Sequence, residues 1–543
     1  MAPKPLSSSS ALSSSSSASS SRGMRQHLLP SGCTKLPTEL LAKIFLTALF
    51  ALDDPLPQIA STETLKQAPT VFTQVCRRWR AVALSTPRLW ARISVTLLGH
   101  ARPPKMRHRR LTKTKMSKQK QKDAEKVLMP EDVQFAMFQT WLARSKAAPL
   151  SCSVHNMHGS REICMRYLEA LCTHSSHWCA INIVGFPLDL FPPLQPDNMQ
   201  LLEELTINSY SSSAHDIALT RAFARAPRLR RVFVRSADTA TWRFPWAQLR
   251  ELYLVDIDTK DGGPQFDASG YHRILSSCSS NLTSLHLAFS CPTESPTEPL
   301  PLTVLAPIHL PNVLELTLNV NEFLPCDPLL RQLQLTSLRT LKLYTSVYPP
   351  ARALATLRAL FAPFADTLRA LDISECKLRA GDALALLRLV PALTALNTCW
   401  SSCITPEFVR ALTLHWDTRG RLEGGQNAML RELKIVKGLG NGGGRGHASD
   451  MEEGEIEYGA CLAEMLESRW RVPMAPLEVQ TAVTSIEQVR EREEMERMEK
   501  ADKAAERLRC ITLRERDLTG MAKTKGAMRR WKEEGLVFNT VMY

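Results

Sequence analysis

The chain has 543 residues, of which 44% are hydrophobic and 22% are charged, a composition typical of soluble globular proteins. This length suffices for two or three domains and a large core. No run of eighteen uncharged apolar residues occurs, so the sequence predicts no membrane-spanning helix. The formal charge of +14 suggests nucleic-acid binding, but residues 102–126 alone hold eleven Lys or Arg and two acidic residues, a net of +9. The excess positive charge is therefore local, and the folded body is not expected to bind nucleic acid.

Residues 1–32 are rich in serine, with twelve serines between residues 7 and 21, and lack the apolar segment of a secretory signal. We predict a disordered tail; the acid-free start also has the composition of a mitochondrial transit peptide, but it is only weakly amphipathic. The fourteen cysteines show no pairing pattern, which favours free thiols in a reducing compartment. The expected location is the cytoplasm, the nucleus or both.

Residues 33–98 contain the spacing of three short amphipathic helices. The first begins at Pro37, whose missing N–H does no harm in a first turn. Its apolar residues share one face: Leu40, Leu41, Ile44, Phe45 and Ala48. A second stripe has the same spacing: Phe72, Val75, Cys76 and Trp79. A third short helix is capped by Ser85 or Thr86, and Trp90 follows it.

A unit this small cannot bury all of its own apolar surface. Either it packs on the body of its own chain, or it leaves part of its apolar face for a partner helix. Periodicity alone leaves both interpretations open.

The order Leu-Pro, Glu-Leu-Leu, Ile-Phe, Val-Cys-Arg-Arg-Trp-Arg and Leu-Trp between residues 36 and 90 resembles an F-box. An F-box docks a substrate receptor onto the Skp adaptor of a cullin–RING ubiquitin ligase. The stretch Ala51–Ala68 is longer than a compact F-box has, and we interpret it as a surface loop. The resemblance implies these adaptor contacts: Leu36, Pro37, Leu40, Leu41, Ile44, Phe45, Val75, Trp79 and Trp90.

The basic segment, residues 99–130, is predicted to be a disordered insertion, because it has few large apolar residues. A nuclear-localisation signal or a polyanion-binding patch is the alternative interpretation.

A leucine pattern, Leu-x-x-Leu-x-Leu, runs through residues 131–475. Its second apolar position falls at Ile181, Leu205, Val232, Leu252, Leu285, Leu316, Leu341, Leu371, Leu396 and Leu433, at intervals of 20 to 37 residues. Alternating residues of a strand face the same side, so each copy predicts a short strand with its leucines in the core. Stacked copies predict an α/β fold: an irregular leucine-rich-repeat solenoid with parallel strands inside and helices outside, such as 354–361 and 382–389.

This combination resembles the F-box proteins with degenerate leucine-rich repeats that are abundant in mushroom-forming fungi. Segments outside the box share the resemblance: 141–150, 174–178, 466–471 and 533–536.

Three further segments contain residue types that could support chemistry. Gly438-x-Gly440-x-x-Gly443 lacks the helix that a dinucleotide site needs, so we predict a flexible Gly-rich and acidic loop over 438–457 and no cofactor. Cys172, His174, His177 and Cys179 are interpreted as core or turn residues, so no metal site is predicted. Residues 476–543 are expected to be a charged helical region, with an ion-paired helix over 485–510.

No catalytic motif is present. The sequence therefore predicts a non-catalytic substrate receptor that binds a Skp-type adaptor, through it a cullin–RING ligase, and an unknown target protein. A scaffold without a ligase role, or a nucleic-acid-associated protein that uses the basic insertion, are the alternatives.

Overall fold

The computed structural model is a mixed α/β protein built around one large parallel sheet, which confirms the α/β part of the predicted fold class. It describes residues 36–50, 58–59, 68–97, 130–209, 221–236, 242–256, 268–278, 281–289, 306–320, 326–345, 351–416, 422–436, 448–470, 508–514 and 525–541. The predicted serine-rich tail, nearly all of the basic insertion and the 438–443 glycine motif lie outside these residues.

Fifteen described strands form the main sheet, each hydrogen-bonded in parallel to the next in the chain order of the sheet. They are β1 (Gln58–Ile59), β2 (Arg92–Leu97), β3 (Leu150–Asn156), β4 (Trp178–Val184), β5 (Glu204–Asn208), β6 (Arg231–Ser236), β7 (Glu251–Asp256), β8 (Ser284–Phe289), β10 (Glu315–Val320), β12 (Thr340–Tyr344), β13 (Ala370–Asp372), β14 (Ala395–Asn397), β17 (Glu432–Lys434), β18 (Cys510–Arg514) and β19 (Val537–Val541). Two small sheets pair β9 (Ile308–His309) with β11 (Leu333–Gln334), and β15 (His415–Trp416) with β16 (Leu422–Gly424).

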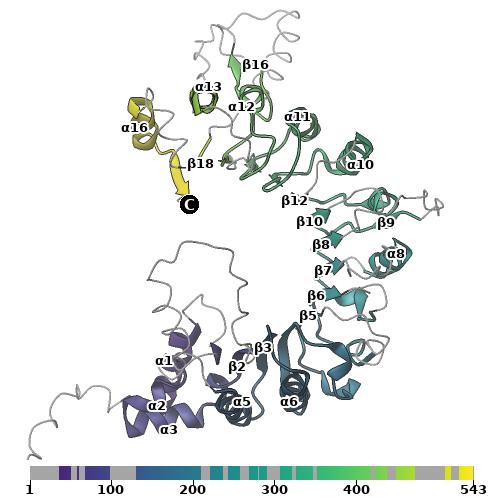
Figure 1. The fold of residues 1–543 in the computed structure, drawn as a ribbon, viewed down its shortest axis with the longest axis vertical. Helices are drawn as coiled ribbons and strands as arrows, with labels where there is room; N and C mark the ends of the chain where they lie inside the picture. The colour runs from purple at the N-terminus through teal and green to yellow at the C-terminus, as the bar shows by residue number, and fades with distance from the viewer. Residues whose placement is uncertain are drawn as a thin grey trace, which may run out of the picture.

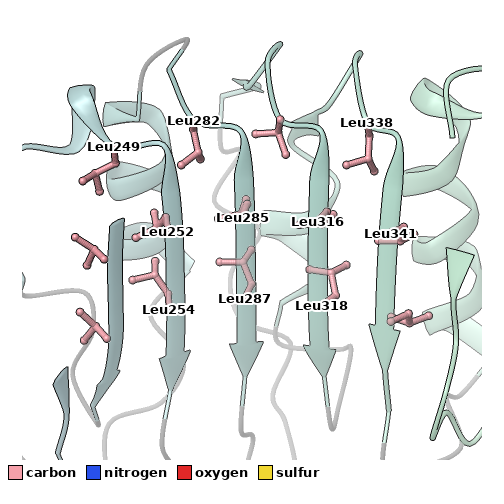
Figure 2. Packing of buried hydrophobic residues seen from close by; sticks show 14 of the residues in the cluster. Leu249, Leu252, Leu254, Leu282, Leu285, Leu287, Leu316, Leu318, Leu338 and Leu341 are labelled. Carbon is pink, nitrogen blue, oxygen red and sulfur yellow. The ribbon is translucent and has the colours of Figure 1, made fainter. Parts of the chain in front are cut away.

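The ten predicted leucine-pattern positions lie side by side in this sheet. From Ile181 to Leu433, each is the register partner of the next on the neighbouring strand. Figure 2 shows four of these positions, Leu252, Leu285, Leu316 and Leu341, in a row across neighbouring strands, with Leu254 on the same side of β7 as Leu252. All ten are buried, as the period of two requires for a strand that covers a core with one face.

The helices lie outside an arc whose inner side is lined by the strands (Figure 1). These outer helices are α5 (Glu131–Ser145), α6 (Arg161–Cys172), α8 (Ala268–Ser277), α9 (Asp327–Leu330), α10 (Ala351–Phe361), α11 (Ala380–Leu387), α12 (Pro406–Leu412) and α13 (Ala448–Trp470). Short 3-10 turns also occur in the connections: η3 (Ser175–His177), η4 (Leu188–Leu190), η5 (Pro196–Asn198), η7 (Trp246–Gln248) and η8 (Ala362–Phe364). The predicted helices over 354–361 and 382–389 correspond to α10 and α11.

The N-terminal helical unit comprises α1 (Thr38–Phe50), α2 (Phe72–Val75), α3 (Arg77–Ser85) and η2 (Pro87–Leu89). The second predicted stripe is broken in two, because Cys76 is extended and its Sγ accepts a hydrogen bond from the backbone N–H of Trp79 at 3.4 Å. Cys76 thus caps α3 and ends α2.

Three boundaries differ from the sequence-based prediction. Residues 92–97, assigned to the F-box, form β2, which pairs with β3 in the main sheet. The expected loop over 438–457 is helical from Ala448 onward, in α13. The expected helical region 476–543 contains α16 (Lys525–Glu533) but also strands β18 and β19, and Cys510, the last residue of the predicted 485–510 helix, begins β18.

Arg469, near the end of α13, is buried and joins three backbone carbonyls. Its guanidinium donates to Leu412 O at 2.8 Å, to Asn427 O at 2.9 Å and to Gln426 O. Burial lowers the pKa of Arg469 to about 9. The side chain ties α13 to the end of α12 and to the turn before β17.

One hydrophobic core runs from Leu41 in α1 to Leu536 before β19. Within the described ranges, every helix is too short or too polar to span a lipid bilayer.

Candidate functional site

The interior of the N-terminal helical unit is an aromatic cluster. The rings of Phe45 and Phe72 are stacked with centroids 4.5 Å apart, and Trp79 lies 4.8 Å from Phe45. Leu41, one turn before Phe45, is buried as well. These contacts hold α1 against α2 and α3.

The side of α1 next to this cluster carries exposed apolar residues. Leu40 is 49% exposed and Ile44 is 47% exposed, whereas their neighbours Leu41 and Phe45 are each 1% exposed. Val75, at the end of α2, is 50% exposed. Leu and Ile side chains at positions i and i+4 of a helix lie one above the other, so Leu40 and Ile44 form one apolar stripe. We call Leu40, Ile44 and Val75 the exposed apolar set.

The start of α1 is fixed by α3. The guanidinium of Arg78 donates a hydrogen bond to the backbone carbonyl of Leu36. Leu36 is half-buried and Pro37 is exposed. The backbone carbonyl of Pro37 accepts the N–H of Leu41 at 3.1 Å and so begins the hydrogen bonding of the helix.

Trp90 is fully buried and links the helical unit to the sheet. Its indole N–H donates to Ala83 O at 2.8 Å, its ring packs edge-to-face on Trp141 at 5.6 Å, and the Arg144 guanidinium lies 4.5 Å from its centroid. Three of the nine predicted adaptor contacts, Leu41, Phe45 and Trp90, are therefore core residues. Their side chains are covered by the chain itself, which corrects the prediction that they contact a partner.

The inner face of the sheet carries a row of rings that the sequence analysis missed. Phe233 on β6, Tyr253 on β7 and His286 on β8 are register partners, with centroids 5.8 and 5.3 Å apart along the row. Each lies between two buried core residues of its strand, so it faces away from the core. Burial, and secondarily the charge of Lys342, lowers the pKa of His286, which is therefore neutral at pH 7. In the sequence, each of these rings occupies the position between the two apolar residues of a Leu-x-Leu copy. A comparison of these positions between repeats could have predicted the row.

Farther along the same face, a shallow hollow of about 150 Å³ opens over β12, β13, β14 and β17. Ala370 and Ala395 leave room for it, and Lys342, Asp372 and Lys434 are among the residues that line it. Asn397 donates a hydrogen bond to Asp372 at 3.0 Å, which holds the carboxylate in place.

The cysteines and histidines between residues 172 and 179 are affected by burial. Burial raises the pKa of the Cys172 thiol to about 12, so the thiol is protonated at neutral pH. Burial, and to a lesser extent the charge of His177, lowers the pKa of His174. Among the described residues, no group of three or more His, Cys, Asp or Glu is placed to hold a metal ion.

No protein-family model matches this chain, and no curated protein matches it.

Proposed function

We propose that this chain is a non-catalytic substrate-recognition subunit of a Skp–cullin–F-box ubiquitin ligase. The N-terminal helices would be the F-box that docks the Skp adaptor. The stacked strands and outer helices would be an irregular leucine-rich-repeat solenoid that holds the target protein.

The observation that carries this proposal is the exposed apolar set. Leu40, Ile44 and Val75 are three of the nine large hydrophobic residues that are exposed in the described part of the chain. They are also three of the nine positions that the F-box resemblance assigns to adaptor contacts. A helical unit that buries Phe45, partly buries Phe72 and leaves this set exposed offers apolar surface of the kind that a partner helix covers.

The mechanism follows from tethering. A target held by the repeats stays close to the ubiquitin-loaded enzyme at the other end of the assembly, which makes attack by a target lysine effectively intramolecular. The receptor then supplies position, and no acid, base or nucleophile of its own. Such a complex would operate in the cytoplasm or the nucleus.

The experiment is co-expression of the full chain with a Skp adaptor, followed by affinity capture. The test variant is Leu40→Ala/Ile44→Ala/Val75→Ala. A matched control, Val133→Ala/Met157→Ala/Met165→Ala, removes three exposed apolar side chains from other parts of the surface.

We expect the wild type and the control to capture the adaptor and the test variant to lose it. Equal capture by test variant and control would refute adaptor docking through α1 and α2. Capture of the adaptor without a cullin would instead favour a scaffold without a ligase role.

A further inference from the structure

Strand β19 forms one end of the main sheet, and among the described strands it is hydrogen-bonded only to β18. The N–H of Val537 donates to the Arg509 carbonyl at 3.1 Å, so alternate residues, beginning with Val537, direct their backbone polar groups at β18. Phe538 and Thr540 lie between them and direct their N–H and C=O groups at the other edge of the strand. Backbone groups at a sheet edge are a template for pairing with an added strand.

Strand β19 lacks the residues that commonly keep sheet edges from pairing. Its sequence, Val-Phe-Asn-Thr-Val, contains no charged residue and no proline. Val537 is 52% exposed. The inner face also loses its charges toward this end, since Glu432 and Lys434 on β17 align, through β18, with Val537 and Asn539 on β19. The edge is therefore uncharged and partly apolar, which favours another strand over a charged ligand.

The sequence of β19 is complementary to itself when two copies run antiparallel. With Asn539 opposite Asn539 of a second copy, Val537 stands opposite Val541, and Phe538 stands opposite Thr540. In this register the Phe538 N–H donates to the Thr540 carbonyl of the second copy, and the Thr540 N–H donates to its Phe538 carbonyl. No like charges stand opposite each other, and the outward backbone groups of both strands are satisfied.

We propose that two copies of this chain form a dimer by antiparallel pairing of β19 with β19 across a two-fold axis. The main sheet of one copy then continues into that of the other. A two-fold contact uses the edge once on each copy, so assembly stops at the dimer. Strand β1, at the other end of the sheet, has only two residues, which disfavours head-to-tail pairing of β19 with β1.

The length of β19 sets the strength of this dimer. A pair of five-residue strands buries less surface than the roughly 1,600 Å² of a standard stable interface. We therefore expect a reversible dimer with a dissociation constant in the micromolar range. Sedimentation velocity measures it on the purified full chain, over about a hundredfold range of concentration that reaches about 100 μM.

Charge substitutions at the proposed axis locate the contact. Asn539 is exposed, and Asn539→Lys or Asn539→Glu places two like charges opposite each other, so each variant alone should weaken the dimer about tenfold or more. An equimolar mixture of the two variants places Lys opposite Glu and should restore the dimer, which a misfolded variant could not do. The matched controls are Asn319→Lys and Asn319→Glu. Asn319 is an exposed asparagine on β10, which is paired on both edges, so these controls should change the dissociation constant less than about twofold.

A wild type that stays monomeric over the whole concentration range would overturn the inference and leave the edge to a strand of a different protein. Species larger than a dimer would also overturn it, because they require a contact that does not close. The same holds if Asn539→Lys dimerises as tightly as Asn319→Lys, or if the mixture of Asn539 variants stays monomeric. The proposed adaptor surface lies on α1 and α2, so adaptor capture and dimerisation are decided separately.

Discussion

Adjacent residues of α1 should respond in opposite ways to the same substitution. Ile44 and Phe45 are about 100° apart around the helix, and only Phe45 faces the aromatic cluster. We predict that Phe45→Ala destabilises the helical unit with little direct effect on an adaptor surface. Ile44→Ala should leave the unit stable and weaken adaptor binding.

The magnitudes follow from burial. Phe45 is 1% exposed, so its truncation removes a complete core side chain and costs about 3–5 kcal/mol. Ile44 is half-exposed, so its truncation should change stability by about 0.5 kcal/mol or less. Covering the exposed half of Ile44 in a complex is worth about 1 kcal/mol, which corresponds to about a fivefold loss of adaptor affinity.

Amide hydrogen exchange by mass spectrometry separates the two effects, because it reports local opening of α1–α3 without assuming that the whole chain unfolds in one step. In Phe45→Ala, exchange in α1 should rise by about two orders of magnitude or more, since each 1.4 kcal/mol is a factor of ten. In Ile44→Ala, it should stay within about twofold of the wild type. Similar exchange in both variants would refute the assignment of one inward and one outward face.

Two further predictions concern the sheet and the end of α13. Arg469→Met should lower the free energy of unfolding around α12 and α13 by about 3 kcal/mol, because three buried carbonyls lose a donor while the cost of burying a cation is relieved. Amide hydrogen exchange in α13 measures this loss of stability. The control is Arg469→Lys, which should lose less. Leu316→Ala, in the centre of the sheet, should cost about 2–5 kcal/mol in urea unfolding, whereas Leu314→Ala, an exposed leucine two residues earlier, should cost about 0.5 kcal/mol or less. Equal shifts of the urea midpoint for the two leucines would contradict the burial of Leu316 and the exposure of Leu314.

The parallel sheet was predictable because its signal is local and repeated. Leu252 and Leu254, or Leu316 and Leu318, reveal a strand by period two, and repetition then places each strand beside the next. The curved α/β layering follows from that repeat.

Other features depend on contacts that no local pattern reveals. Strand β2 has six residues, Arg92–Leu97, and directly follows the segment that resembles an F-box. It pairs with β3, which lies more than fifty residues later in the chain. Strand β18 likewise pairs with β17 although the two lie far apart in sequence. The ring row was missed because Phe233, Tyr253 and His286 occupy variable positions in separate repeats, and only the register brings them together.

Trp90 lies between the helical unit, which is the proposed adaptor-binding part, and the sheet, which is the proposed target-binding part. The sequence pattern assigned it to the adaptor, yet it packs between α3 and α5 and is followed two residues later by β2. The helical unit and the sheet therefore share a core, with no flexible linker of the described chain between Trp90 and β2. For a receptor that works by tethering, this arrangement matters, because effective concentration is highest when the spacing between the two binding surfaces is fixed. A rigid junction at Trp90 would fix the distance between α1 and the inner face of the sheet. Substitutions that loosen this junction should therefore impair ubiquitin transfer even when both binding surfaces remain intact.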